Sequence, residues 1–290
     1  MGRADEFGQD EGGQVVNPDG ASPVLLVCEH AGNRIPARYG DLGISAEVLA
    51  SHVAWDPGAL PVAEGLSDRL GAPLVVQDVS RLVYDCNRPP ESPGAMPGVS
   101  EIHAIPGNAD LTEETRAERI AAIYRPFERR LRAACEAHVE RHPNGAVVTI
   151  HTFTPIFHGQ PRKVEIGVLH GADARLADAL LAEASVEAGL DVRRNAPYGP
   201  ADGVLHTLET HAVPRRLRHA MIEIRNDLVA TPDAAAAMAD RLAGWIGRAM
   251  NDEAAPSRRA SASGRSPLMS ARSTGSTAGS GSRPCTPCSR

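Results

Sequence analysis

The stretch VLLVCEH, residues 24–30, joins a short apolar run to two side chains that can bind metals. Its first five residues have the length and apolar character of a buried strand, and Glu29 and His30 follow directly. Two more apolar runs repeat the pattern, one leading into His151 and the other into Glu223. In an open α/β sheet, ligands bind outside the carboxyl ends of the strands. The sequence therefore predicts that these polar residues, distant along the chain, meet at one edge of a sheet.

Apolar runs alternate with helical patterns along the chain, which is typical of a sheet covered by helices. The segment 89–108 is rich in Pro and Gly and is predicted to be an irregular loop folded over a site. We expect strands at 74–79 and 164–169, and helices at 58–70, 112–141, 173–188 and 232–250.

The 290 residues are enough to bury a substantial core. We expect one catalytic domain over residues 22–253. Residues 254–290 are mainly Ser, Gly, Arg and Pro, with too few large apolar side chains to offset the entropy of ordering. We therefore predict that this tail and the acidic, Gly-rich segment 1–21 are disordered.

Charge and hydropathy restrict the partners. The formal net charge is −6 and the arginines are scattered, whereas proteins that bind nucleic acid usually concentrate Lys and Arg in a patch. No run approaches the roughly 20 apolar residues of a membrane helix, and the N-terminus lacks the features of a secretory signal. We expect a cytoplasmic protein that binds neither nucleic acid nor a membrane and acts on a small molecule.

A catalytic zinc ion usually takes three protein ligands from His, Asp and Glu and keeps one position open. His30 and His151 are the best histidine candidates because each follows a predicted strand. The acidic ligand is either Glu29 or Asp56, and Asp56 has the alternative role of a helix cap. His52 would share a helix face with Asp56 if that segment were helical. The ion would be Zn²⁺ or another divalent metal.

Other polar residues have candidate roles around such an ion. Glu223 is the candidate general base, since a carboxylate in a closed pocket can accept a proton from metal-bound water. The cluster SRLVYDCNRP, residues 80–89, is suited to anion recognition, because arginine grips carboxylates in a bidentate manner. Within it, Arg81 is a candidate for polarising the attacked carbonyl, and Asn87 and Arg88 for binding the substrate.

Three residues with weaker signals complete the candidate site. Strand alternation places Arg225 on the same face as Glu223, so Arg225 is included among the substrate-binding candidates. His103, in the Pro-rich loop, and His211, before the last predicted strand, could line the pocket.

Six motifs, in this order, resemble the N-formylglutamate amidohydrolase family, and the resemblance covers about residues 22–250. They are VCEHAGNRIP (27–36), HVAWDPGA (52–59), SRLVYDCNR (80–88), IPGN (105–108), IHTFTP (150–155) and IEIRNDL (222–228). The resemblance implies a three-layer α/β/α sandwich with a mixed sheet, similar to the zinc carboxypeptidases. It also implies hydrolysis of an amide bond in a small N-acyl amino acid with a free carboxylate. In the family, formylglutamate is cleaved to formate and glutamate in bacterial histidine breakdown.

Carried onto this chain, the resemblance supports His30, Asp56 and His151 as metal ligands and Glu223 as base. It also likens the adjacent Asn87 and Arg88 to the Asn-Arg pair that holds a substrate carboxylate in carboxypeptidase-like enzymes. One position departs from the zinc carboxypeptidases, which carry a glutamate three residues after the first histidine, where this chain has Asn33. The acidic ligand must then come from elsewhere, and Asp56 is preferred over Glu29.

Two alternative functions stay open at this level. One is a metallocarboxypeptidase or cell-wall amidase, which would need an open groove for a larger peptide. The other is a catalytically silent module that binds a small carboxylate, which would bind its acidic ligand without a metal.

Overall fold

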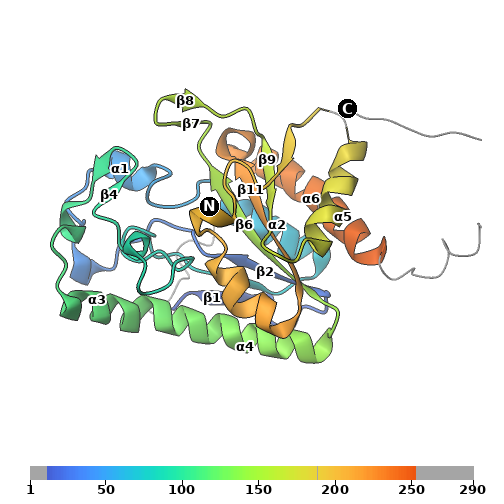
Figure 1. The fold of residues 1–290 in the computed structure, drawn as a ribbon, viewed down its shortest axis with the longest axis horizontal. Coiled ribbons are helices and arrows are strands. Elements are labelled where there is room, and N and C mark those ends of the chain that lie inside the picture. The colour runs from blue at the N-terminus through green and yellow to red at the C-terminus, as the bar shows by residue number, and fades with distance from the viewer. Residues whose placement is uncertain (1–11, 188, 253–290) are drawn as a thin grey trace, which may run out of the picture. The chain divides into compact units, whose positions relative to one another are not determined.

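A seven-stranded mixed sheet forms the centre of the fold in the computed structural model, which describes residues 12–187 and 189–252 (Figure 1). The strands are β1 (Gln14–Val16), β2 (Val24–Cys28), β3 (Leu74–Val76), β6 (Ala146–Phe153), β9 (Ile166–Leu169), β10 (Val192–Arg194) and β11 (Arg218–Arg225). Their spatial order is β1-β3-β2-β6-β11-β9-β10. The central strands β3, β2, β6 and β11 are parallel, so their carboxyl ends lie at the same edge. β1 and β9 run antiparallel to β3 and β11, which makes the sheet mixed.

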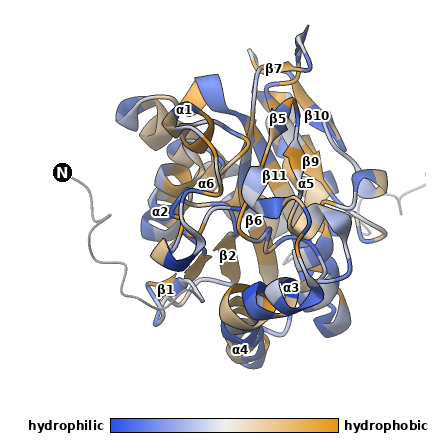
Figure 2. Ribbon diagram, turned by 90° about the vertical axis from the view of Figure 1, so that its left-hand side faces the viewer, coloured by the Kyte–Doolittle hydropathy of each residue, from blue (hydrophilic) through white to orange (hydrophobic). Residues whose placement is uncertain are grey.

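Helices cover both faces of this sheet, with α2 (Ala59–Leu70), α5 (Arg175–Val186) and α6 (Pro232–Asp252) on one face and α4 (Arg125–Arg141) on the other. The short helices α1 (Ala46–Ala50) and α3 (Glu113–Arg119) belong to the connecting segments. Alternate strand residues point to opposite faces, so Leu26 packs in the core with α2, α5 and α6 while its neighbour Leu25 packs in the core with α4. In Figure 2, the apolar colouring of β6, β9 and β11 matches their position between the helical layers. The predicted three-layer α/β/α sandwich is confirmed.

The predicted elements are present with small shifts at their ends. The predicted helix 112–141 is one helical run, in which a π-helical turn at Ile120–Tyr124 joins α3 to α4. Its cap is Thr112, whose hydroxyl accepts a hydrogen bond from the backbone N–H of Thr115. The two predicted strands are shorter than expected and correspond to β3 and β9.

The prediction for the N-terminal segment 1–21 needs correction. Gln14–Val16 form β1, which pairs with β3 at the edge of the sheet. Two valines in this short run let it add to an existing strand edge, although the surrounding segment is too polar to show a strand pattern by itself. Residues 1–11 and the predicted disordered tail 254–290 lie outside the described residues.

Two small hairpins extend beyond the sheet near the carboxyl ends of its central strands. One pairs β4 (Val99–Ser100) with β5 (His103–Ala104) inside the predicted loop 89–108, and the other pairs β7 (Ile156–Phe157) with β8 (Gln160–Pro161) after β6. Within residues 12–187 and 189–252, none of the helices combines the length and apolar character needed to cross a bilayer.

A buried histidine in α4 should make the stability of the protein depend on pH. His138 is 1% exposed, and burial together with the neighbouring His142 lowers the pKa of His138 to about 4. The unfolded chain takes up this proton near pH 6.5, whereas the folded protein does so only near pH 4. Stability is therefore lost as the pH falls below about 6.5, by about 2 kcal/mol from this group between pH 7 and pH 5.

Urea unfolding at pH 7 and pH 5 measures this effect. We expect His138→Leu to reduce the loss of stability between the two pH values by about that amount, while the exposed control His158→Ala leaves it unchanged. An unchanged pH dependence in His138→Leu would contradict the prediction.

Candidate metal and active site

The carboxyl ends of β2, β6 and β11 bring the predicted residues together. β6 pairs in parallel with β11, and Glu223 lies directly opposite His151 in the register. β2 lies on the other side of β6, so His30, two residues after β2, comes close to the same point. The rings of His30 and His151 are 4.9 Å apart, edge to face. The convergence predicted from the strand ends is therefore observed.

Asp56 completes a group of three side chains that could hold a metal ion. It lies in the turn before α2, where its backbone N–H donates to the carbonyl of His30. Its Oδ2 lies 3.3 Å from Nδ1 of His30 and 2.8 Å from Nδ1 of His151. The three ligand atoms all lie within 4.8 Å of one another, and all three residues are buried. Asp56 is not the helix cap, because the N-cap of α2 is Gly58 and the Asp56 carboxylate contacts His30 and His151.

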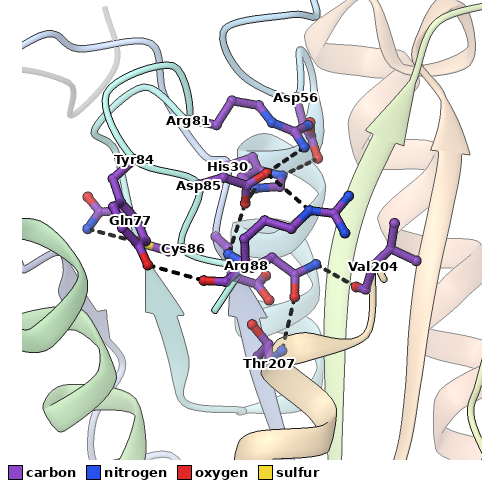
Figure 3. A network of polar contacts seen from close by, with 12 residues as sticks. His30, Asp56, Gln77, Arg81, Tyr84, Asp85, Cys86, Arg88, Val204 and Thr207 are labelled. Atoms are coloured by element: carbon purple, nitrogen blue, oxygen red, sulfur yellow. Dashed lines mark hydrogen bonds and ion pairs between the residues drawn. The ribbon is translucent and has the colours of Figure 1, made fainter. Parts of the chain in front are cut away.

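The second ring nitrogen of each histidine faces another carboxylate. Nε2 of His30 lies 2.7 Å from Oδ1 of Asp85, and Nε2 of His151 lies 3.2 Å from Oε2 of Glu29. Figure 3 shows His30 between Asp56 and Asp85. Glu29 therefore lies on the side of His151 that faces away from Asp56. The geometry favours Asp56 over Glu29 as the acidic ligand.

Arg81 is held by the same cluster. Its guanidinium lies 3.3 Å from Oδ1 of Asp56 and 2.8 Å from Oδ2 of Asp85 (Figure 3). Burial alone would lower the pKa of Arg81, but the two carboxylates outweigh it and raise that pKa further above its usual range. Arg81 thus keeps its positive charge in the lining of the site. Asp56 and Asp85 compete with a substrate for its guanidinium.

The charges of the cluster suit a divalent cation. Burial alone would lower the pKa of His151, but the nearby Glu29 carboxylate and the hydrogen bond to Asp56 outweigh burial and raise it. The direction of this shift shows that the surrounding carboxylates favour a positive charge at this point. With neutral imidazoles, the three carboxylates and one guanidinium of the cluster would leave an excess of negative charge. A cation bound by two imidazole nitrogens and one carboxylate removes that excess, and this donor set is typical of catalytic zinc.

Metal binding should be visible in thermal unfolding. An ion that binds only the folded protein stabilises it by about 2.7 kcal/mol at a free concentration of 100 times its Kd. We expect chelation to lower the Tm of metal-loaded protein and added Zn²⁺ to restore it. The double variant His30→Ala/His151→Ala should show neither change, and a metal-dependent Tm in that variant would place the ion elsewhere.

Glu223 occupies the position expected of a base. It is 5% exposed, and its Oε2 has no hydrogen-bond partner among the described residues. Burial raises the pKa of Glu223 to about 7, and the Asp56 carboxylate adds to the increase, although His151 opposes it. A carboxyl group with such a pKa can both accept and return a proton near neutral pH.

A cavity of about 590 Å³ opens above the cluster and has the size of a small-molecule site. His30, Asp56, His151 and Glu223 line it, together with Arg81, Asn87 and Arg88. As predicted, the loop 89–108 forms part of the wall. Glu101 in this loop joins two other segments, since its carboxylate binds Nε2 of His52 at 2.8 Å and accepts the backbone N–H of His158 at 2.8 Å.

The predicted substrate pair Asn87 and Arg88 is already engaged. The Asn87 side chain donates to the carbonyl of Val204 at 2.6 Å and accepts from the N–H of Thr207 at 3.0 Å. Both ends of its amide thus contact the backbone, so Asn87 anchors the segment 204–207, while it also lines the cavity and its NH₂ group has a second N–H. Arg88 donates through Nη1 to the carbonyls of Asp202 and Gly203, and its side chain remains 21% exposed in the cavity.

Three other predicted residues lie outside the cavity. Arg225 pairs with Asp227 at 2.8 Å and with Glu165, directly before β9, at 3.4 Å. His103 lies in β5, and His211 is buried in the π-helical turn Leu208–Ala212. None of the three lines the cavity.

Reasoning from the sequence missed two features of the site. Asp85 belongs to the cluster 80–88 but was given no role, although it contacts His30 and Arg81. Tyr198 lines the cavity, and its hydroxyl accepts a hydrogen bond from Arg162 at 2.8 Å. The motif could have indicated Asp85. No local pattern singles out Tyr198.

Comparison with known proteins agrees with this architecture. The family model for N-formylglutamate amidohydrolase matches residues 22–230. The structure of the gene product Atu2144 from Agrobacterium tumefaciens is 54% identical in sequence, with a TM-score of 0.81, and the match covers 86% of this chain and 99% of that one. The structure of N-formylglutamate amidohydrolase from Ralstonia eutropha JMP134 is 21% identical, with a TM-score of 0.63 over 82% of this chain and 97% of that one, and so supports the fold. No curated protein matches the chain. With the family model matching well over half of its length, the chain belongs to the N-formylglutamate amidohydrolase family, a family of amidohydrolases.

Proposed function

We propose that the protein hydrolyses the amide bond of a small N-acyl amino acid with a free carboxylate, N-formylglutamate being the first candidate. The observation that carries this proposal is the placement of a His-Asp-His group, a buried glutamate and two arginines around one cavity of about 590 Å³. A cavity of this size suits a small substrate better than the open groove that a peptidase or cell-wall amidase would need.

In the proposed mechanism, His30, Asp56 and His151 hold a divalent metal ion, with Zn²⁺ the first choice for this donor set. When bound, such an ion supplies an acidified water and an electrophile for the amide carbonyl. Glu223 accepts the proton of the attacking water and then returns it to the departing amide nitrogen, for which a raised pKa is suited.

The arginines of the cavity orient the substrate. Arg88 lines the cavity and has fewer charged partners than Arg81, so we assign Arg88 to the substrate carboxylate. Arg81, which two carboxylates hold in place, adds positive potential near the reacting carbonyl. Tyr198 adds a hydroxyl group to the cavity lining, where its oxygen accepts a hydrogen bond from Arg162 and its proton can be donated to a ligand.

A substrate panel tests the proposal. The metal-loaded protein should release amine from one or more N-formyl or N-acetyl amino acids, and formate from the formyl compounds, with no release from peptides of four or more residues. Cleavage of peptides or cell-wall fragments alone would favour the peptidase or amidase. Tight binding of an acidic ligand without metal or turnover would instead identify a silent binding module.

A further inference from the structure

Each histidine of the metal group has a carboxylate of its own on the side away from the group. Asp85 faces Nε2 of His30 at 2.7 Å, and Glu29 faces Nε2 of His151 at 3.2 Å. Both carboxylates are buried, with the Asp85 side chain 4% exposed and the Glu29 side chain 0% exposed. Buried carboxylates are costly unless they have a charged or hydrogen-bonding partner.

These contacts decide which ring nitrogen carries the proton. An ionised carboxylate only accepts hydrogen bonds, so Nε2 of His30 must donate to Asp85. Nε2 of His151 forms an ion pair with Glu29 at 3.2 Å without hydrogen-bond geometry, and the nearby negative charge favours the proton on this nitrogen. In the neutral imidazole the other nitrogen, Nδ1, then has a free lone pair. In both histidines Nδ1 points at Oδ2 of Asp56, which is also an acceptor. The two Nδ1 atoms and Oδ2 of Asp56 are then three lone-pair acceptors that face one another, as the ligands of a bound cation do.

The two carboxylates are fixed to different degrees. Asp85 also accepts from Arg81 at 2.8 Å and from the backbone N–H of Asn87 at 2.9 Å, so its carboxylate cannot easily rotate away from His30 (Figure 3). Glu29 makes its ion pair with His151 from the adjacent strand end, not with its neighbour His30. The ion pair gives the buried Glu29 carboxylate a charged partner, although Glu29 is not one of the three metal-group residues.

We propose that Asp85 and Glu29 are positioning residues, which hold His30 and His151 as Nδ1 ligands of one metal ion. This inference rests on the metal site of the proposed function. Carboxylates in such a position orient the ring and make the ligating nitrogen more basic, and their loss typically weakens metal binding 10–100-fold.

Metal affinity tests the roles of the two residues without any assay of turnover. Zn²⁺ is titrated into metal-free protein in the presence of a competing chelator. We expect about 10–100-fold weaker binding for Glu29→Gln and for Asp85→Asn. The matched control is Asp78→Asn, which neutralises another buried carboxylate that pairs with Arg34 at 2.6 Å outside the site. The control should bind Zn²⁺ as the wild type does.

A second measurement uses only wild-type protein, so its outcome does not depend on whether the variants fold. Long-range ¹H–¹⁵N spectra of Zn²⁺-loaded wild-type protein distinguish the protonated from the metal-bound nitrogen of each ring. We expect protonated Nε2 and metal-bound Nδ1 in His30 and His151. Metal-bound Nε2 in either ring would overturn the proposal, as would wild-type affinity in both Glu29→Gln and Asp85→Asn.

The outcomes also separate this inference from the proposed function. Wild-type protein that hydrolyses N-acyl amino acids with Zn²⁺ but shows Nε2 ligation refutes only the positioning roles. Wild-type protein that binds no Zn²⁺ refutes both. Protein that binds Zn²⁺ through Nδ1 but cleaves none of the panel refutes the proposed function alone.

Discussion

Glu223→Gln is expected to lower kcat on the best N-acyl amino acid by about 10²–10⁴-fold, the usual contribution of a general base. Glutamine keeps the shape of the side chain but cannot accept a proton from the attacking water. The carboxylate lies beside His151 in the register and is buried in the cavity wall, without a hydrogen-bond partner for Oε2 among the described residues. Burial and the Asp56 carboxylate disfavour the charged form of Glu223, although His151 opposes them.

The variant should therefore fold and bind Zn²⁺ as well as the wild type, and its stability should equal or exceed that of the wild type. Steady-state kinetics together with chelator competition measure both properties. Glu165→Gln, which removes a carboxylate paired with Arg225 away from the cavity, is the matched control and should retain full kcat. A Glu223→Gln protein with kcat within threefold of the wild type would refute the assigned base.

Asp56→Asn is expected to abolish activity by weakening Zn²⁺ binding at least 100-fold, more than the loss of a surrounding carboxylate does. The carboxylate contributes one of the three donor atoms and the only negative charge among them. An asparagine oxygen keeps the size but is a weak ligand for zinc, which in proteins is bound by Cys, His and carboxylates. Oδ2 of Asp56 also receives the backbone N–H of Thr152 at 3.3 Å, so its position is set by the end of β6.

Comparing Asp56→Asn with Glu29→Gln decides between the two acidic residues that the sequence left open. If Asp56 is the ligand, Asp56→Asn loses metal at chelator concentrations at which Glu29→Gln retains most of it. The reverse order would make Glu29 the ligand and would overturn the assignment. Elemental analysis of both purified variants provides an independent measurement.

Much of the fold was predictable because it depends on local patterns. The continuous apolar runs that became β2 and β6 and the 3.6-residue period of α4 are set by short-range sequence. β1 was missed because its three residues have no pattern of their own and are stabilised by pairing with β3. The order of the strands also cannot be derived from these runs, since it depends on contacts between distant segments.

Part of the candidate site was likewise predictable from the sequence, and part depends on the tertiary structure. The sequence by itself determined which residues stand at strand ends, and six motifs pointed to His30, Asp56, His151 and Glu223 as one site. Only the tertiary structure decided that Glu29 pairs with His151 and not with its neighbour His30, that Asp85 faces His30, and that Asn87 contacts the backbone. The physical reason is that a side chain's partner depends on strand register and on packing between segments that are distant in the sequence, whereas sequence patterns report only what is local.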